Sequence, residues 1–275
     1  MSEWAAAQDA AAHTFVDALD DEIEVTGDDG HHLQRVRRIR VGEHLTAADG
    51  LGSWRRYEVE AIAPRLLRLG ARGARHVEPE ILPRVALAVG ITKAGALDTV
   101  VARCTELGVA RVVPVRTQRS VVRWDRAQAD RAVERLRTIA REAGAQSRRA
   151  RLPEVSSVVD FSDLLSHPGL VIADRDGRPA HALFPAFTPI TPENKALGPI
   201  EQLEGKGRNP SDAAAVTAEW LVAVGPEGGF DASELEATRE SPRLSLGPHV
   251  LRAETAPIAA VAVMVDLARS LWREL

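Results

Sequence analysis

Two glycine-containing segments near the carboxyl end have the composition and position of ligand-binding turns. Residues 225–229 read Gly-Pro-Glu-Gly-Gly and follow the apolar run 221–224. Residues 246–256 contain Gly247 and follow a shorter apolar stretch. Glycine lets the backbone approach a flat ligand closely and leaves N–H groups accessible. Neither segment has the spacing of a dinucleotide or Walker phosphate loop, so NAD and ATP are poorly supported.

The elements around these turns alternate between predicted strands and helices, which is typical of a parallel α/β sheet. Both turns lie at the carboxyl ends of strands, where open α/β sheets bind ligands. Asp231 with Glu234 three residues later has the pattern of a helix-capping box. The predicted strands are 84–89, 111–115, 170–173, 220–224 and 244–246, and the predicted helices are 97–107, 125–145 and 254–272.

The amino-terminal part has a different pattern. Residues 1–30 predict one or two strands with turns, and 35–41 and 54–62 predict strands on either side of an Asp-Gly turn at 49–50. Short strands separated by turns favour a small β-barrel.

Glycine and proline mark the boundaries of these regions. Residues 70–83 contain two of each and are interpreted as a linker. We therefore predict a β-barrel domain over 1–78 and an α/β domain over 79–275. Residues 186–217, rich in Pro, Gly and polar residues, are interpreted as a flexible insertion in the second domain.

Composition limits the class of protein. The 275 residues are 45% hydrophobic and 27% charged, which allows a sizeable core and excludes global disorder. The single cysteine excludes a disulfide framework, and the eight histidines show no metal-ligand spacing, so no metal is predicted. No apolar run reaches the roughly 20 residues that span a bilayer, and no signal peptide is visible. These features predict a soluble cytoplasmic protein without membrane contact.

Charge is unevenly distributed within a chain of net charge −4. Residues 31–151 carry a strong excess of arginine, whereas 1–30 contain acids and no Lys or Arg. A concentrated basic stretch is expected of a phosphate-binding surface, and a set of solvated helix faces is the alternative.

Five motifs in the right order resemble those of one family. They are Gly-Pro-Glu-Gly-Gly-Phe at 225–230, Leu-Gly-Pro-His-Val-Leu-Arg-Ala-Glu-Thr-Ala at 246–256, Cys-Thr-Glu-Leu-Gly-Val at 104–109, Arg-Ser-Val at 119–121 and Gln-Ser-Arg-Arg at 146–149 with Pro153. Together they resemble the RsmE family of SPOUT methyltransferases, which methylates N3 of a uridine in 16S ribosomal RNA. Residues 31–50 are similar to the family's amino-terminal PUA-like RNA-binding barrel. The resemblance covers almost the whole chain apart from 186–217.

The resemblance implies a SPOUT-type parallel sheet with a carboxyl-terminal trefoil knot, a homodimer and S-adenosylmethionine as methyl donor. The 30S subunit with its 16S RNA is the implied substrate. The implied cofactor-binding residues lie in the two turns and at one strand end: Ala173, Gly225, Pro226, Glu227, Gly228, Gly229, Leu246, Gly247, Val250, Leu251, Arg252 and Ala256.

Methyl transfer to N3 requires loss of the N3 proton, and an arginine can stabilise the resulting anionic oxygens. Arg252 and Arg149 are the candidate arginines, and Glu254 and Glu227 are candidates to receive the proton or orient an arginine. The alternative for Arg252 is a structural ion pair with Glu254.

The resemblance also indicates RNA contacts. Gln146 has the donor and acceptor groups to bind a uracil edge, with a helix-capping amide as the alternative. The candidate RNA-binding residues are Arg35, Arg37, Arg38, Arg119, Gln146 and Arg149.

The chain departs from the family pattern at Ala145, where the family commonly has Glu, which excludes a catalytic carboxylate at this position. This keeps open the hypothesis of an inactive RNA-binding or ribosome-assembly protein. A nicotinamide-dependent oxidoreductase is a third hypothesis, and the missing dinucleotide fingerprint counts against it.

Overall fold

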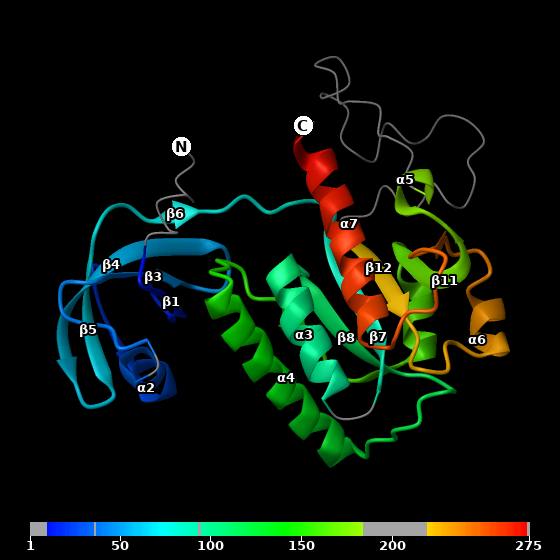
Figure 1. The fold of residues 1–275 in the computed structure, drawn as a ribbon, viewed down its shortest axis with the longest axis horizontal. Coiled ribbons are helices and arrows are strands. Elements are labelled where there is room, and N and C mark those ends of the chain that lie inside the picture. The colour runs from blue at the N-terminus through cyan, green and yellow to red at the C-terminus, as the bar shows by residue number, and fades with distance from the viewer. Residues whose placement is uncertain (1–9, 36, 93–94, 184–218, 274–275) are drawn as a thin grey trace. The chain divides into compact units, whose positions relative to one another are not determined.

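The computed structural model describes residues 10–35, 37–92, 95–183 and 219–273, and the insertion predicted at 186–217 lies outside them. The chain divides into two compact units, drawn in Figure 1. The first comprises Met1–Glu80 with Arg141–Leu152, and the second comprises Ile81–Ala140 with Pro153–Leu275. None of the described helices combines the length and apolarity that crossing a membrane requires.

The first unit is built on a six-stranded sheet in the order β1-β3-β4-β5-β2, with β6 paired to β4. The β1–β3 pairing is parallel and the others are antiparallel. Its core includes the fully buried side chains Leu45, Tyr57, Val59 and Leu67. The elements are β1 (Ala12–Phe15), β2 (Glu22–Thr26), α2 (Gly27–Arg35), β3 (His44–Ala48), β4 (Ser53–Ala63), β5 (Leu66–Ala71) and β6 (His76–Val77).

The strand predicted at 35–41 is wrong. Residues up to Arg35 form the helix α2, and none of the described residues 37–43 belongs to a strand. Arg38 has a φ of 52°, which an extended strand does not accommodate. Leu33 and Ile39 are buried, so this segment packs through single apolar anchors rather than a strand face. The predicted linker at 70–83 also contains the end of β5 and all of β6.

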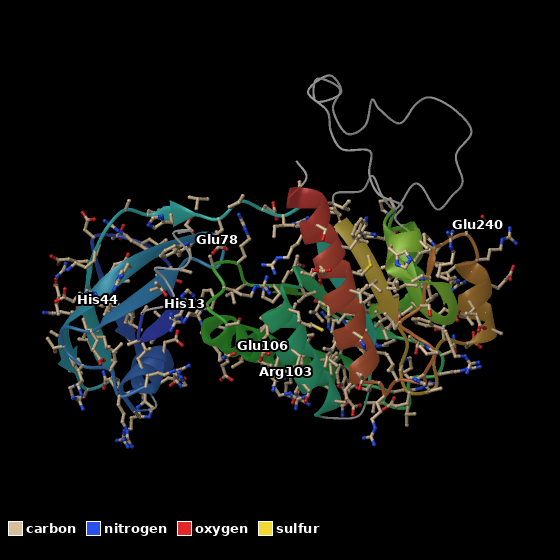
Figure 2. All side chains as sticks on the ribbon, turned by 45° about the horizontal axis from the view of Figure 1, so that its top comes forward. His13, His44, Glu78, Arg103, Glu106 and Glu240 are labelled. Carbon is tan, nitrogen blue, oxygen red and sulfur yellow. The ribbon has the colours of Figure 1, made fainter. Side chains whose placement is uncertain are left out.

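A buried histidine joins β1 to the turn after α4 (Arg126–Gln146). His13, labelled in Figure 2, accepts a hydrogen bond at Nδ1 from the Thr46 hydroxyl at 2.7 Å. Its Nε2–H donates to the carbonyl of Arg149 at 3.0 Å. The carbonyl can only accept, which fixes this tautomer. Burial lowers the pKa of His13 to about 4, so the ring is neutral at neutral pH.

The second unit is built on a parallel sheet in the order β10-β8-β7-β12-β11-β13, with β9 paired to β8. Its strands are β7 (Arg84–Gly90), β8 (Arg111–Arg116), β9 (Glu154–Val155), β10 (Val159–Asp160), β11 (Leu170–Arg178), β12 (Glu219–Val224) and β13 (Arg243–Leu244). Its helices are α3 (Ala96–Leu107), most of α4, the 3-10 helix η1 (Phe161–Ser166), α5 (Ala180–Leu183), α6 (Ala232–Ala237) and α7 (Thr255–Arg273). The predicted strands 84–89, 111–115 and 220–224 and the three predicted helices are confirmed to within one residue at each end. The strand predicted at 170–173 continues to Arg178, and the strand predicted at 244–246 is confirmed only at Leu244.

Two hydrophobic cores lie on opposite faces of this sheet. Along β7, Val85, Leu87 and Val89 contribute to one core, and Ala86 and Ala88 contribute to the other. This alternation follows from the two-residue period of a strand. The larger core is completed by α3, α4 and α7, and α7 lies across β7 and β12 in Figure 1.

A cluster of charges holds the amino-terminal ends of the central strands together. Glu219 on β12 forms ion pairs with Arg111 of β8 and with Arg84 of β7, the latter at 3.9 Å. Its Oε1 also lies 3.3 Å from His167 Nε2. Gly169 N–H donates to His167 Nδ1, so the proton of the neutral ring is on Nε2, facing Glu219. Burial raises the pKa of Glu219, but the hydrogen bonds from His167 and Arg111 dominate and lower it to about 2.

We expect Glu219→Gln to lower the free energy of unfolding by about 1–3 kcal/mol at neutral pH, because two arginines lose their charged partner. The folded-state pKa is depressed, so this stabilisation is present above pH 4.5 and lost as the pH falls toward about 2. Urea denaturation measures both effects. Glu236→Gln, which removes an exposed ion-pair partner of Arg239, should change stability by less than about 0.5 kcal/mol. Equal effects of the two variants would contradict the structural role of Glu219.

The buried His13 should make the stability of the first unit depend on pH. The unfolded chain binds a proton near pH 6.5, whereas folded His13 resists protonation until about pH 4. Stability is therefore fully present above pH 6.5 and decreases as the pH falls through this window, by up to roughly 3 kcal/mol. We expect His13→Asn to flatten the pH dependence of urea denaturation relative to the wild type. His31→Asn, which replaces an exposed histidine, is the control and should behave like the wild type. If the free energy of unfolding of His13→Asn depends on pH as steeply as that of the wild type, His13 does not carry this dependence.

Candidate active site

The first predicted turn lies at the carboxyl edge of the second unit's sheet, where two central strands end together. Val89 and Val224 are paired in the parallel β7–β12 ladder, so Gly90 and Gly225 follow at the same level. A Cβ on Gly90 would lie 2.6 Å from the Pro226 nitrogen and Cδ. Only glycine permits this approach of the strand end to the loop.

The loop itself is a tight turn. Gly229 N–H donates to the Pro226 carbonyl at 2.8 Å, and Gly229 has a φ of 68°. A Cβ on Gly225 would lie 2.8 Å from the Gly229 carbonyl carbon. Glu227, Gly228 and Gly229 are exposed, so the turn presents glycine backbone to a ligand at the sheet edge.

Gly228 differs from the other glycines of this turn. A Cβ on Gly228 would meet only the Arg119 side chain, at 3.4 Å. Arg119 donates a hydrogen bond to the Gly228 carbonyl at 2.8 Å. The residue predicted to bind RNA therefore contacts the turn predicted to bind the cofactor. The three atoms nearest to a Cβ on Gly228 all belong to the Arg119 side chain, at 3.4–3.9 Å, which is ordinary van der Waals contact.

The second predicted turn runs from the end of β13 to the start of α7. Gly247 has a φ of 124°, which favours glycine there. The carbonyl of Arg252 accepts hydrogen bonds from the Thr255 and Ala256 N–H groups at 2.9 Å, and so begins α7. Val250 is 84% exposed, so this predicted contact residue is open to solvent.

Three of the predicted cofactor contacts pack against the larger core. Ala173, Leu246 and Ala256 are partly buried and pack against this core. Ala173 pairs with Leu244 across the β11–β13 ladder, which places the strand end beside the turn that Leu246 begins. These side chains offer an apolar surface that is only partly covered by protein.

The charged candidates of this unit are solvent-exposed. Arg252 Nη1 lies 4.0 Å from Glu254 Oε1, and the Arg252 side chain is 86% exposed. An exposed pair at this distance contributes little to stability. The ion pair with Glu254, which was the alternative role for Arg252, is therefore weak and leaves the Arg252 guanidinium available to a ligand. Glu227 lies in the first turn and is also exposed.

One buried carboxylate connects the Arg-Ser-Val segment to the first turn. Glu234 Oε1 accepts from the Gln118 N–H at 2.8 Å, and its Oε2 accepts from the Asp231 N–H at 2.8 Å. The Asp231 carboxylate caps α6 by accepting from the Ser233 and Glu234 N–H groups, which confirms the predicted capping box.

The remaining predicted residues belong to the first unit. Gln146 ends α4 and is exposed, and Arg149 follows in the turn whose carbonyl binds His13. Arg35, Arg37 and Arg38 are exposed at and after the end of α2. These candidates belong to the first unit, whereas the two turns belong to the second.

Sequence reasoning missed Gly90 and the second hydrogen bond of Glu234. The signal for Gly90 was a glycine directly after an apolar strand, matched by Gly225 after the neighbouring strand. Nothing in the local sequence indicates that Glu234, besides its capping box, accepts from a residue 116 positions earlier.

Comparison with known proteins gives one consistent result. Family models for an RNA methyltransferase domain and an RNA methyltransferase PUA domain match residues 79–265 and 25–69. Ribosomal RNA small subunit methyltransferase E of Mycobacterium tuberculosis is 34% identical over 94% of this chain and 92% of that protein. The Bacillus subtilis protein of the same name is 27% identical over 91% of this chain and 94% of that protein.

Solved structures share the fold. The Neisseria gonorrhoeae ribosomal RNA small subunit methyltransferase E, bound to S-adenosyl methionine, superposes with a TM-score of 0.72 at 22% identity over 93% of this chain and 97% of that chain. A Legionella pneumophila methyltransferase in complex with SAM gives a TM-score of 0.73 at 22% identity, over the same shares of the two chains. The SPOUT-type sheet and the PUA-like amino-terminal domain expected from the resemblance are confirmed. With two family models and a relative at 34% identity along nearly its full length, the chain belongs to the ribosomal RNA small subunit methyltransferase E family of RNA methyltransferases.

Proposed function

We propose that this protein transfers the methyl group of S-adenosylmethionine to N3 of a uridine in the 16S RNA of the small ribosomal subunit. The observation that carries the proposal is that the two family-specific turns follow β12 and β13, which both pair with β11 in parallel, so both turns lie at the same carboxyl edge of the sheet. There the glycine turn leaves ligand space and three apolar side chains are only partly covered. The names of the relatives support the RNA substrate.

The residues present fit S-adenosylmethionine. Gly225 and Gly90 allow the backbone turn, and the exposed backbone at Glu227 and Gly228 offers N–H groups to polar atoms of the ligand. Ala173, Leu246 and Ala256 would face the apolar parts of the adenosine, with Val250 and Leu251 closing over it. When bound, the cofactor supplies a methyl group already activated by its positive sulfur.

The protein's part of the chemistry is to bind the uracil and handle one proton. The new bond joins N3 to the methyl carbon, and the bond from sulfur to that carbon breaks. The N3 proton leaves to Glu254 or Glu227. The Arg252 guanidinium is positioned to stabilise the negative charge that develops on the two neighbouring carbonyl oxygens. Arg149 is a second candidate for this role.

The finer features of the family resemblance belong to the same proposal. Arg35, Arg37, Arg38, Arg119, Gln146 and Arg149 bind the RNA, and the basic character of 31–151 supports this. The protein acts in the cytoplasm as a homodimer on the assembled 30S subunit, and its carboxyl-terminal segment is knotted.

Methyl transfer can be tested directly with labelled S-adenosylmethionine and 30S subunits from cells that lack the modification. We expect label in 3-methyluridine of the 16S RNA. We expect Arg252→Ala to lower kcat by about 100-fold, the usual effect of removing one donor to a developing oxyanion, with Arg252→Lys less affected. Label in a different nucleoside would overturn the substrate, and an unchanged kcat in Arg252→Ala would remove this arginine from catalysis.

Cofactor binding can be tested at Gly228, where the protein itself has room for a side chain. We expect Gly228→Val to keep the melting temperature of the wild type and to weaken S-adenosylmethionine binding at least tenfold, because the side chain enters the ligand space. Isothermal titration calorimetry measures the affinity. Ala232→Val, at the exposed start of α6, is the matched control. Wild-type affinity in folded Gly228→Val would place the cofactor elsewhere.

A further inference from the structure

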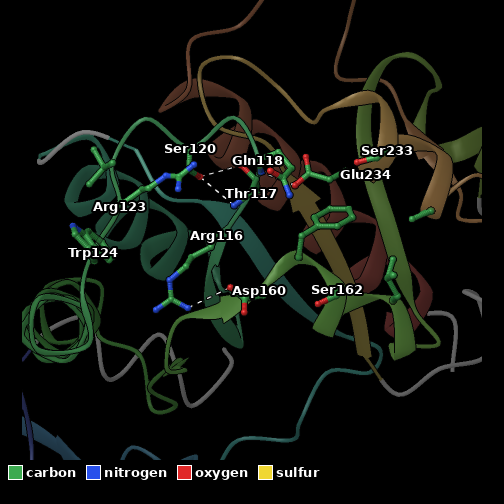
Figure 3. A pocket seen from close by; sticks show the side chains of 14 residues that line it. Arg116, Thr117, Gln118, Ser120, Arg123, Trp124, Asp160, Ser162, Ser233 and Glu234 are labelled. Carbon is green, nitrogen blue, oxygen red and sulfur yellow. Dashed lines mark hydrogen bonds and ion pairs between the residues drawn. The ribbon is translucent and has the colours of Figure 1, made fainter.

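A separate cavity opens in the second unit beside the Arg119 segment, whose neighbours Gln118 and Ser120 line it. Figure 3 shows it between the chain that follows β8, the start of η1 and the first turns of α6. Its volume is about 540 Å³, which is within the ~300–1,000 Å³ typical of small-molecule sites and sufficient for a nucleotide. None of the residues predicted as site residues from the sequence lines it.

The walls combine cations, an aromatic ring and hydroxyl groups. Arg116, Arg123 and Trp124 line the cavity, together with the hydroxyls of Ser120 and Ser162. In Figure 3 the Arg123 side chain extends toward Ser120. Among the described residues Arg123 has no ion-pair partner. Trp124 packs one part of its ring against the larger core and leaves the rest at the cavity wall.

Two carboxylates also line the cavity, and both already have partners within the protein. Asp160 Oδ1 lies 3.4 Å from Arg116 Nη1, and both side chains of this pair are exposed. An exposed pair at this distance is weak, so a phosphate can compete for Arg116. Glu234 directs its two oxygens to the backbone N–H groups of Gln118 and Asp231. The cation left without a counter-charge is Arg123.

This combination matches a nucleotide of single-stranded RNA better than a protein segment. Single-stranded nucleic acids are bound by an aromatic side chain that stacks on a base and by guanidinium groups that contact phosphate. The Ser162 hydroxyl adds a hydrogen-bond donor and acceptor for the ribose or the base edge, whereas the Ser120 hydroxyl is already hydrogen-bonded to Thr117. An apolar peptide would leave the two guanidiniums without partners.

A hydrogen bond links the segment that lines the cavity to the glycine turn. Arg119, between cavity residues Gln118 and Ser120, donates to the Gly228 carbonyl. The loop wall is also fixed to α6 by the Gln118–Glu234 hydrogen bond. Both sites therefore lie on the carboxyl edge of one sheet and share one segment of backbone.

We propose that this cavity binds a nucleotide of the substrate RNA that neighbours the target uridine, with its phosphate on Arg123 and Arg116 and its base against Trp124. The proposal rests on the RNA substrate of the proposed function. It adds a second contact that orients the RNA strand and selects single-stranded substrate.

Binding of 30S subunits, separate from methylation, tests this subsite. We expect Arg123→Ala and Trp124→Leu each to weaken 30S binding and raise the KM for 30S about tenfold, the effect of losing one stacked base or phosphate contact. The dissociation constant for S-adenosylmethionine and the kcat should stay at wild-type values in both variants. The melting temperature should stay at the wild-type value in Arg123→Ala and fall somewhat in Trp124→Leu, which loses contact with the larger core. Arg131→Ala, which removes an exposed arginine of α4 outside the cavity, is the charge-matched control and should bind like the wild type.

Three outcomes would overturn the subsite: unchanged 30S binding in both cavity variants, an equal loss in Arg131→Ala, or a loss of S-adenosylmethionine affinity instead. Ultraviolet crosslinking of wild-type protein to 30S subunits, read by mass spectrometry, supplies a second test. A crosslinked peptide containing residues 120–124 supports the subsite, and crosslinks only in other peptides contradict it. If the wild type binds 30S subunits through this cavity but forms no 3-methyluridine, the proposed reaction fails while the subsite stands.

Discussion

The close approach of two strand ends is the constraint on which the candidate site depends. Gly90 and Gly225 end neighbouring parallel strands, and each would place a Cβ within 3 Å of the turn at 225–229. A side chain at either position would move the turn away from the sheet edge. The exposed glycine backbone would then leave the carboxyl edge that it shares with the second turn at 246–256. The two hydrophobic cores on either face of the sheet keep these strand ends in register.

In the second unit, the charged groups at the start of the strands are tightly paired, whereas most of those at the carboxyl edge are exposed. The strand starts are joined by a charge cluster around Glu219, far along the strands from the turns at their other end. At the carboxyl edge the charged groups are exposed and weakly paired, as Arg252 and Glu254 show. Arg119 and Glu234 are exceptions, because their hydrogen bonds hold the loop after β8 to the glycine turn and to α6. The site thus combines a hydrogen-bonded backbone with exposed, weakly paired charged side chains, an arrangement that suits binding of a large polar substrate.

The α/β domain could be predicted from the sequence because its elements have clear periodicity and clear ends. Apolar runs such as 84–89, and the capping box at Asp231, are local signals that tertiary contacts reinforce. The segment 35–41 was misread because its apolar residues alternate with arginines as in a strand. A left-handed Arg38 and the helix before it break that pattern. The Gly90–Pro226 contact and the cavity by Trp124 could not be predicted, because both are formed by segments that are distant in the chain.

Hydrogen exchange followed by mass spectrometry, with and without S-adenosylmethionine, tests most directly whether the two turns form the cofactor pocket. Backbone N–H groups that contact a ligand, or that a ligand holds in place, exchange more slowly in the complex. The geometry predicts slower exchange in peptides covering 225–230 and 246–256, with no change in α2. Protection confined to 116–124 and 160–165, around the separate cavity, would contradict the assignment of the cofactor to the glycine turns.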